Sequence, residues 1–261
     1  MTPRRTLIAV AVAAVALGAS VPVLSRTFHH WFPGFAQAAL PPGATLPEIA
    51  DLPVVAVVPR AGAPRAAVVL ITGSGGWAEI DRKLAAGFAA EGVATLGLDS
   101  LRYFLAPRSP DEVGTDVGRM IEAARRVWGV EDVALVGYSF GADAVPVAYN
   151  RLPPADRAVV RTVAMLGLSR TADLAMGVAK IAAWIKGYPQ STASEIARLE
   201  RAPERPSIVC VYGAEEQAVG RTLCPSLDPA RVRLIETDGG HHFDGDYGRL
   251  ARVVAATLKR A

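Results

Sequence analysis

The chain has 261 residues, of which 51% are hydrophobic and 20% charged, and its formal net charge is +3. The whole excess lies in residues 1–43, which contain three arginines and no acidic residue, so the other 25 basic and 25 acidic side chains balance. A balanced domain without a basic face excludes a nucleic-acid-binding protein. After this leader, about 210 residues remain, enough for one domain with a full hydrophobic core.

The N-terminus has the order of an export signal. Arg4 and Arg5 precede a mostly apolar run over residues 7–24, which predicts a signal peptide in residues 1–25. The run is also close to the shortest that spans a bilayer, and three aromatic residues that could lie at the interface follow it: Phe28, Trp31 and Phe32. An uncleaved membrane anchor is therefore the alternative to a signal peptide. Either alternative predicts an exported protein.

A proline-rich segment follows the leader and precedes the domain. Prolines at positions 33, 41, 42, 47 and 53 predict an extended tether over residues 26–52. Within residues 53–261, apolar runs of strand length lie at 54–58, 67–72, 94–98, 133–138, 160–166, 208–212 and 232–236. Most of them are continuously apolar, as strands covered on both faces must be.

Helical periodicity occupies the segments between these strands. It lies at 78–91, 111–128, 140–151, 172–185, 192–201 and 245–260. The alternation predicts a doubly wound, mostly parallel sheet of about seven strands with helices on both faces, and the short connections predict little or no lid. Since such sheets bind ligands beyond the carboxyl ends of their strands, polar residues at those ends are the candidates for a site.

The sequence Gly-Tyr-Ser-Phe-Gly at residues 137–141 lies between an apolar strand and a helical pattern. This context is typical of a nucleophile elbow, in which a tight turn lifts the hydroxyl of Ser139 above the sheet and the two glycines avoid a clash between strand and helix. The alternative is an ordinary strand-to-helix turn with Ser139 as the N-cap of the helix.

A serine nucleophile needs a base and an acid that orients the base. Glu216 follows the strand at 208–212 and His241 follows the strand at 232–236, in the chain order Ser, acid, His of an α/β hydrolase. Their neighbours Glu215 and His242 are the alternatives for the two roles. The two remaining histidines, His29 and His30, lie outside the domain. The sequence therefore predicts a serine hydrolase of the α/β-hydrolase fold.

The oxyanion of such a reaction requires two backbone N–H donors. We expect one from Phe140, directly after the nucleophile, and the other from Ser74, in the loop after the strand at 67–72. The glycines beside Ser74 could also form a phosphate-binding nest, but the sequence of a P-loop is absent. Trp77 is expected to pack beneath the next helix or, alternatively, to line the cleft.

Two cysteines, Cys210 and Cys224, are present in this exported chain. An even number in an oxidising compartment predicts a disulfide, and two buried free thiols are the alternative. The chain has no C-x-x-C motif and few histidines, so we expect neither a metal site nor a cofactor.

Taken together, six segments resemble the AcvB/VirJ family of exported bacterial α/β-hydrolases, and the resemblance runs from about residue 65 to the C-terminus. The segments are residues 73–77, 98–104, 137–143, 150–153, 210–213 with Cys224, and 239–247. The resemblance implies a periplasmic serine hydrolase that releases lysine from lysyl-phosphatidylglycerol at the membrane surface. It also implies a link to virulence and to type IV secretion components of the envelope. This chain has Ser74 where the family usually has aspartate. A contact between the family's aspartate carboxylate and the substrate ammonium therefore cannot be assigned to this chain.

A lysyl group carries ammonium charges and requires carboxylates near the cleft. Asp99 and Asp143, near strand ends, and Asp81, one helical turn after the oxyanion loop, are the candidates. Asp143 could instead serve only as a cap or ion-pair partner, and Asp99 only as a turn residue. Arg102 could neutralise Asp99 or bind a lipid phosphate. Two other functions stay open: a general carboxylesterase, and a non-catalytic binding component of an envelope assembly.

Overall fold

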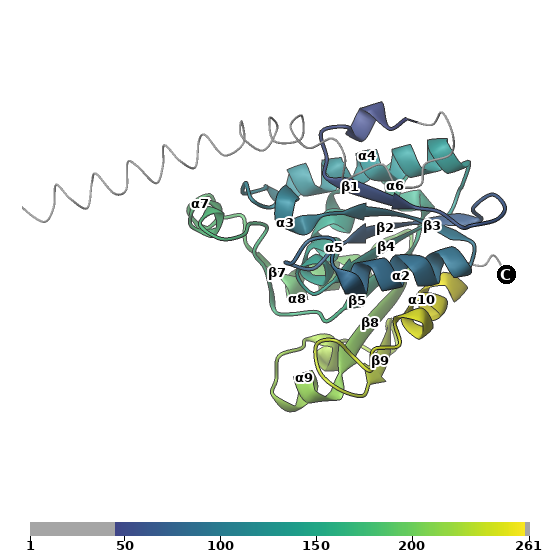
Figure 1. Ribbon diagram of the computed structural model, residues 1–261. Helices are drawn as coiled ribbons and strands as arrows, with labels where there is room; N and C mark the ends of the chain where they lie inside the picture. The colour runs from purple at the N-terminus through teal and green to yellow at the C-terminus, as the bar shows by residue number, and fades with distance from the viewer. Residues whose placement is uncertain (1–44, 259–261) are drawn as a thin grey trace, which may run out of the picture.

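A computed structural model describes residues 45–258 of the chain (Figure 1). The predicted signal peptide or anchor and residues 26–44 of the predicted tether lie outside the described residues. At the centre is a seven-stranded sheet of order β1-β3-β2-β4-β5-β8-β9, parallel except for β1. The strands are β1 (Val54–Val57), β2 (Ala66–Ile71), β3 (Val93–Leu98), β4 (Val133–Tyr138), β5 (Val160–Leu166), β8 (Ser207–Gly213) and β9 (Val232–Thr237). The predicted doubly wound sheet is confirmed.

Helices cover both faces of this sheet. α2 (Glu79–Ala90) and α10 (Tyr247–Ala256) lie side by side on one face, and α4 (Pro110–Trp128), α5 (Phe140–Arg151) and α8 (Thr192–Glu200) cover the other (Figure 1). β2 shows why its sequence is continuously apolar. Val69 and Ile71 pack into the core under α4 and α5, whereas Val68 and Leu70 pack into the core under α2 and α10.

The bounds of α4 follow from its end residues. Ser109 is the N-cap, and its hydroxyl accepts from the amide of Glu112 while the Glu112 carboxylate accepts from the amide of Ser109. Gly129 ends the helix at a φ of 65°, a conformation that glycine adopts without steric cost. Among residues 45–258, no helix is both long and apolar enough to cross a membrane.

Several short elements were not predicted. They are η2 (Pro47–Ile49), α3 (Ser100–Tyr103), α6 (Pro154–Val159), β6 (Thr171–Ala172), β7 (Gln190–Ser191), α9 (Ala214–Ala218) and η3 (Cys224–Ser226). The helix expected over 172–185 begins only at α7 (Ala179–Ile185), because residues 171–172 pair with residues 190–191 in a small antiparallel sheet. We call the excursion over residues 171–191 the arm.

The end of the predicted tether belongs to the domain instead. Residues 47–52 contain η2, and the side chains of Ile49 and Leu52 are buried in the core beside α4. The Arg119 guanidinium donates to the carbonyl of Glu48, and Arg126 pairs with the Glu48 carboxylate. Proline frequency indicated an extended segment here, but burial of two large apolar side chains holds it against the domain.

Candidate active site

Ser139 lies in a strained turn between β4 and α5. Its backbone has a φ of 53° and a ψ of −117°, which a non-glycine residue adopts only when the surrounding structure enforces it. The amide of Ser139 donates to the Leu166 carbonyl of β5 at 2.8 Å. A Cβ atom on Gly137 would lie 2.2 Å from the Gly141 carbonyl oxygen, and one on Gly141 would lie 2.0 Å from the Ile71 carbonyl oxygen. Both glycines of the motif are therefore required by close backbone approach.

His241 reaches this serine from the loop after β9. Its Nε2 lies 2.7 Å from the Ser139 Oγ, within hydrogen-bond distance. Tyr138 supports the histidine, because its ring lies 5.4 Å from the imidazole between centroids and its hydroxyl donates to the His241 carbonyl at 3.3 Å. The His241 side chain is 43% exposed, so its ring is open to solvent.

Glu216 completes a chain of three side chains. Its Oε1 lies 2.5 Å from the Nδ1 of His241, and its Oε2 accepts from the amide of Gly213 at 3.3 Å. Glu216 lies in α9, directly after β8, and only 7% of the residue is exposed. A buried carboxylate bonded to Nδ1 orients the imidazole so that Nε2 can accept the serine proton.

The neighbouring alternates lie elsewhere. Glu215 is exposed and has its side chain near Gly240, and its amide donates to the Gly239 carbonyl. The His242 Nδ1 lies 3.3 Å from the Tyr138 hydroxyl. The structure thus joins Ser139, His241 and Glu216 by hydrogen bonds and brings neither alternate to the serine.

The loop after β2 lies against the nucleophile. A Cβ on Gly73 would be 3.6 Å from the Ser139 Cβ, so the residue that directly precedes the expected donor Ser74 lies beside the serine. Phe140 is the first residue of α5, where backbone amides have no partner within the helix. The loop is buttressed by Ser100, whose amide and hydroxyl bond to the Thr72 hydroxyl and carbonyl at 2.9 and 2.7 Å. This arrangement suits an oxyanion hole.

A disulfide joins Cys210 of β8 to Cys224 of η3, as predicted. Both cysteines are fully buried. The bond closes the segment that carries Glu216, and the amide of Arg221 donates to the Glu216 carbonyl at 2.9 Å within it. The disulfide therefore fixes the acid-bearing loop to its strand.

Asp99 and Asp81 form an acidic pair near the loop after β2. Asp99 caps α3 through a bond from the Arg102 amide, and its carboxylate lies 3.7 Å from the Arg102 guanidinium. Asp81 is fully buried, with one oxygen accepting from the Ala78 amide and the other without a hydrogen bond among the described residues. Burial, with a smaller contribution from the charge of Asp99, raises the pKa of Asp81 to about 6.

Asp143 and Trp77 have packing partners of their own. Both oxygens of Asp143 accept from Ser169, one from its amide at 2.7 Å and one from its hydroxyl at 2.6 Å. Burial raises the pKa of Asp143 to about 7. The Trp77 ring lies against Gly97 of β3, beneath the start of α2. Asp143 thus positions the chain after β5, and Trp77 packs beside the sheet.

Three contributors to the site were not predicted: Tyr138, Ser100 and Ser169. Tyr138 lies inside the Gly-x-Ser-x-Gly motif, so its place beside the nucleophile could have been read from the sequence. Ser100 and Ser169 have no such signal, because each acts through a partner distant in the chain. In the part of the chain that the structure describes, no group of three His, Cys, Asp or Glu side chains could hold a metal ion, and we assign no residue to one.

Comparison with known proteins supports this fold. A sequence model of the family described as "Bacterial virulence protein (VirJ)" matches residues 65–261. No curated protein sequence matches the chain. Three solved structures are similar: Est1E from Butyrivibrio proteoclasticus, dienelactone hydrolase from Anabaena variabilis and the esterase domain of a Rhodothermus marinus protein.

These three structures have low sequence identity and similar architecture. Their identities to this chain are 14%, 15% and 17%, and their TM-scores are 0.50, 0.52 and 0.51. Each alignment covers 78% of this chain and, respectively, 91%, 88% and 91% of the other. The likeness confirms the predicted α/β-hydrolase fold.

Proposed function

Since this chain belongs to the VirJ family of bacterial virulence proteins, we propose that it is a serine hydrolase that releases lysine from lysyl-phosphatidylglycerol or a related aminoacyl phospholipid. The observation that carries the proposal is the hydrogen-bonded chain from Ser139 through His241 to Glu216 at the carboxyl edge of the sheet. A pure binding protein has no need of this arrangement. The three similar solved structures, of which one is named a dienelactone hydrolase and one an esterase domain, share the fold that presents it.

In the proposed reaction, the Ser139 hydroxyl gives its proton to Nε2 of His241 as its oxygen attacks the ester carbonyl. The amides of Phe140 and Ser74 stabilise the negative charge on the carbonyl oxygen. The imidazolium, oriented by Glu216, then protonates the departing glycerol oxygen and leaves lysine esterified to Ser139. His241 next takes a proton from water, whose oxygen attacks the acyl-enzyme, and returns that proton to the serine as lysine leaves.

Asp99 is proposed to hold an ammonium group of the lysyl moiety, because its carboxylate lies beside Gly76 in the loop that carries Ser74. Asp81, also a candidate, is fully buried and accepts from the Ala78 amide, so we assign it a positioning role at the start of α2. Asp143, also a candidate, has both oxygens engaged by Ser169, so we assign it a positioning role. Arg102 is proposed to meet the lipid phosphate.

The proposed location is the periplasm. The Cys210–Cys224 disulfide fits an oxidising compartment, and the basic and apolar order of residues 1–25 fits export. Contact with type IV secretion components is part of the same proposal and rests only on the resemblance to the AcvB/VirJ family.

The test is incubation of purified protein with lysyl-phosphatidylglycerol, other aminoacyl phospholipids and plain phospholipids, with detection of released amino acid. Ser139→Ala should lower lysine release by roughly 10⁴-fold or more while leaving thermal stability nearly unchanged. Lysine release that is unaltered in this variant would contradict the enzyme assignment.

The two other candidate functions have different outcomes in the same panel. Release of fatty acids, or equal turnover of simple esters, favours a general carboxylesterase, the activity closest to the name of the Rhodothermus marinus esterase domain. Binding without turnover of any ester favours a binding component of an envelope assembly.

A further inference from the structure

Helix α7, in the arm, exposes its large apolar side chains and buries its small ones. Four apolar residues on or next to α7 are 85%, 62%, 75% and 69% exposed: Val178, Ile181, Trp184 and Ile185. Ala179 and Ala183 are buried on the opposite side. A helix on a soluble surface normally has the reverse arrangement, so this face is built to be covered.

The arm rises from the edge of the sheet that carries the nucleophile. It begins just after β5, and its Met176 amide donates to the Phe104 carbonyl at 2.9 Å. The Phe104 ring in turn lies 4.8 Å from the ring of Phe140, the residue after Ser139. Figure 1 shows α7 projecting from the same end of the molecule as α3 and α9, which follow the carboxyl ends of β3 and β8.

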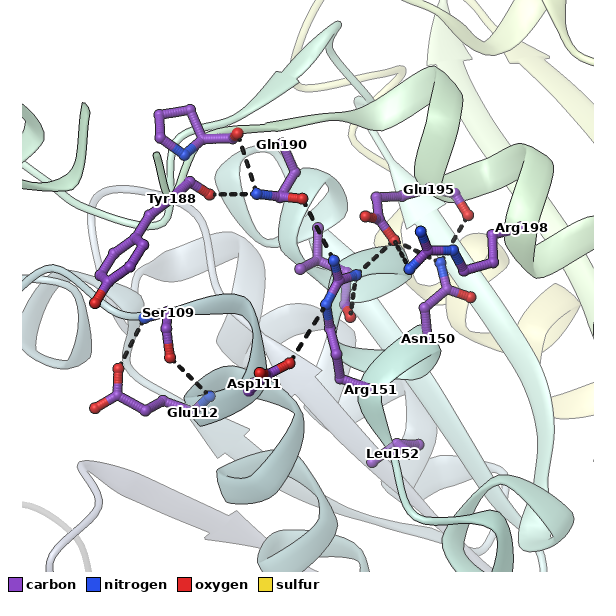
Figure 2. A network of polar contacts seen from close by, with 12 residues as sticks. Ser109, Asp111, Glu112, Asn150, Arg151, Leu152, Tyr188, Gln190, Glu195 and Arg198 are labelled. Atoms are coloured by element: carbon purple, nitrogen blue, oxygen red, sulfur yellow. Dashed lines mark hydrogen bonds and ion pairs between the residues drawn. The ribbon is translucent and has the colours of Figure 1, made fainter. Parts of the chain in front are cut away.

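A polar network fixes the base of the arm (Figure 2). Arg151, at the end of α5, donates to the Glu195 carboxylate at 2.6 Å and to the Gln190 side-chain carbonyl at 3.3 Å. The Gln190 amide group donates to the Tyr188 carbonyl at 2.8 Å, and Asn150 donates to the Glu195 carboxylate at 2.7 Å. The Arg151 and Glu195 side chains are only 15% and 4% exposed, so α7 is presented on a firm base.

The other large hydrophobic side chains exposed in residues 45–258 lie at this same end. Leu101 and Leu105 are 42% and 49% exposed on and just after α3, and Val219 is 65% exposed just after α9. Every such residue therefore lies on a segment that follows the carboxyl end of a strand. The exposed apolar side chains thus gather at the end of the molecule on which Ser139 lies.

The charges on the arm and beside it favour an anionic surface as the partner. This segment has three exposed basic residues, Arg170, Lys180 and Lys186. It has one acidic residue, Asp173, which pairs with Lys180. Lysine stems and a tryptophan ring suit the boundary between lipid headgroups and acyl chains, where apolar stems are buried and charged ends reach the phosphates.

We propose that α7 and the exposed apolar side chains around it dock this end of the protein onto the surface of an anionic phospholipid bilayer. Docking would bring the Ser139 edge to the headgroups without drawing lipid into the protein core. The inference rests on the proposed function for its substrate, because a lipid-linked ester must be reached at the bilayer.

A label on the arm tests the docking in the full chain. Cys210 and Cys224 are bonded to each other and are the chain's only cysteines, so Ile181→Cys would provide a single free thiol for an environment-sensitive fluorophore. Ala63→Cys is the matched control, since it is exposed in the loop before β2, at the opposite edge of the sheet. The label reports on its own position even when residues 7–24 also bind the vesicle.

With vesicles of phosphatidylglycerol and phosphatidylcholine, the label at 181 should shift its emission to shorter wavelength and become severalfold less accessible to iodide, and the label at 63 should not. A label at 181 that stays equally quenched on vesicle-bound protein overturns the proposal. So does protection that appears without lipid and grows with protein concentration, because a second copy of the chain then covers the face. Equal protection by pure phosphatidylcholine overturns the anionic partner.

A kinetic experiment separates docking from chemistry. Ile181→Asp combined with Ile185→Asp should lower kcat/KM on vesicle-borne lysyl-phosphatidylglycerol by roughly tenfold or more, mainly through KM, and leave hydrolysis of a short-chain soluble lysyl ester unchanged. Ala63→Asp should change neither. Equal loss on both substrates overturns the docking role. If the wild type hydrolyses neither substrate, the proposed function fails, and the label experiment on the Ser139→Ala variant still decides the docking.

Discussion

The imidazole of His241 has a defined partner at each nitrogen. Glu216 lies at Nδ1 and Ser139 at Nε2, so the tautomer with hydrogen on Nδ1 leaves Nε2 free to accept the serine proton. The adjacent His242 faces the Tyr138 hydroxyl instead. Of these two adjacent histidines, His241 is therefore placed to act as the base, and His242 is an exposed histidine without a hydrogen bond to Ser139.

Replacing each histidine by alanine should separate their roles. His241→Ala removes the proton acceptor of Ser139 and should lower kcat for hydrolysis of lysyl-phosphatidylglycerol by roughly 10³-fold or more. His242→Ala should cost less than about tenfold, since it loses only a hydrogen bond to Tyr138. Steady-state kinetics of the two variants provide the measurement, and a greater loss in His242→Ala would transfer the role of base to that residue.

Asp143 should make the stability of the protein depend on pH. Its pKa is raised by burial to about 7 in the folded chain, above the ordinary value of 3.8, so the folded state holds a proton that the unfolded state has lost between about pH 4 and pH 7. Its contribution to the free energy of unfolding is therefore highest below about pH 4 and falls by up to about 1.4 kcal/mol per pH unit across that window.

Asp143→Asn should remove this pH dependence, because the amide keeps an acceptor for the Ser169 amide and has no charge. The variant should gain stability relative to wild type as pH rises from 5 to 7, measured by urea denaturation at several pH values. Asp111→Asn, at a side chain that is 93% exposed, is the control and should leave the profile unchanged. A difference between Asp143→Asn and wild type that does not vary with pH would contradict the assignment.

Among the elements, those built from local signals were predictable. The apolar continuity of β2 and β4 identifies strands covered on both faces, and the Ser109 cap with Gly129 marks both ends of α4. The arm was not predictable in the same way. Periodicity over 172–185 indicates one helix, but pairing of Thr171 with Ser191 is non-local and shortens it, and the large apolar side chains of α7 face outward.

In the candidate site, too, residues marked by a local sequence pattern were predictable and residues placed by non-local contacts were not. Ser139 could be predicted because strand, turn and helix are contiguous around it. The choice of Glu216 over Glu215 depends on which side chain the first turn of α9 directs inward, and only Glu216 is buried. The bonds between Asp143 and Ser169 join segments that no local pattern relates.

The disulfide links the β8 element to the loop that carries the acid. Replacing both cysteines by alanine frees a loop with a sequence separation of 14, and the chain-entropy model gives a loss of roughly 3 kcal/mol in the free energy of unfolding. The same change should lower kcat, because Glu216 depends on that loop for its position. Urea denaturation and kinetics measure the two effects, and unchanged stability together with unchanged kcat would contradict the positioning role.

For the molecule as a whole, two apolar cores on opposite faces of one sheet define the domain. The core under α4 and α5 extends into η2 through Ile49, which is fully buried. Composition alone favours a boundary at residue 53, since prolines surround this segment. The packing contacts of residues 46–52 move the boundary toward the N-terminus, because a domain ends where its chain ceases to bury apolar surface.

This boundary can be tested with one side chain. Ile49→Ala leaves a cavity in the core and should lower the free energy of unfolding by about 2–4 kcal/mol, measured by urea denaturation. Ile181→Ala is the matched control, because the same deletion at a side chain that is 62% exposed should change stability by less than about 0.5 kcal/mol. Equal and small effects of the two changes would mean that η2 does not contribute to the core and that the domain does begin near residue 53.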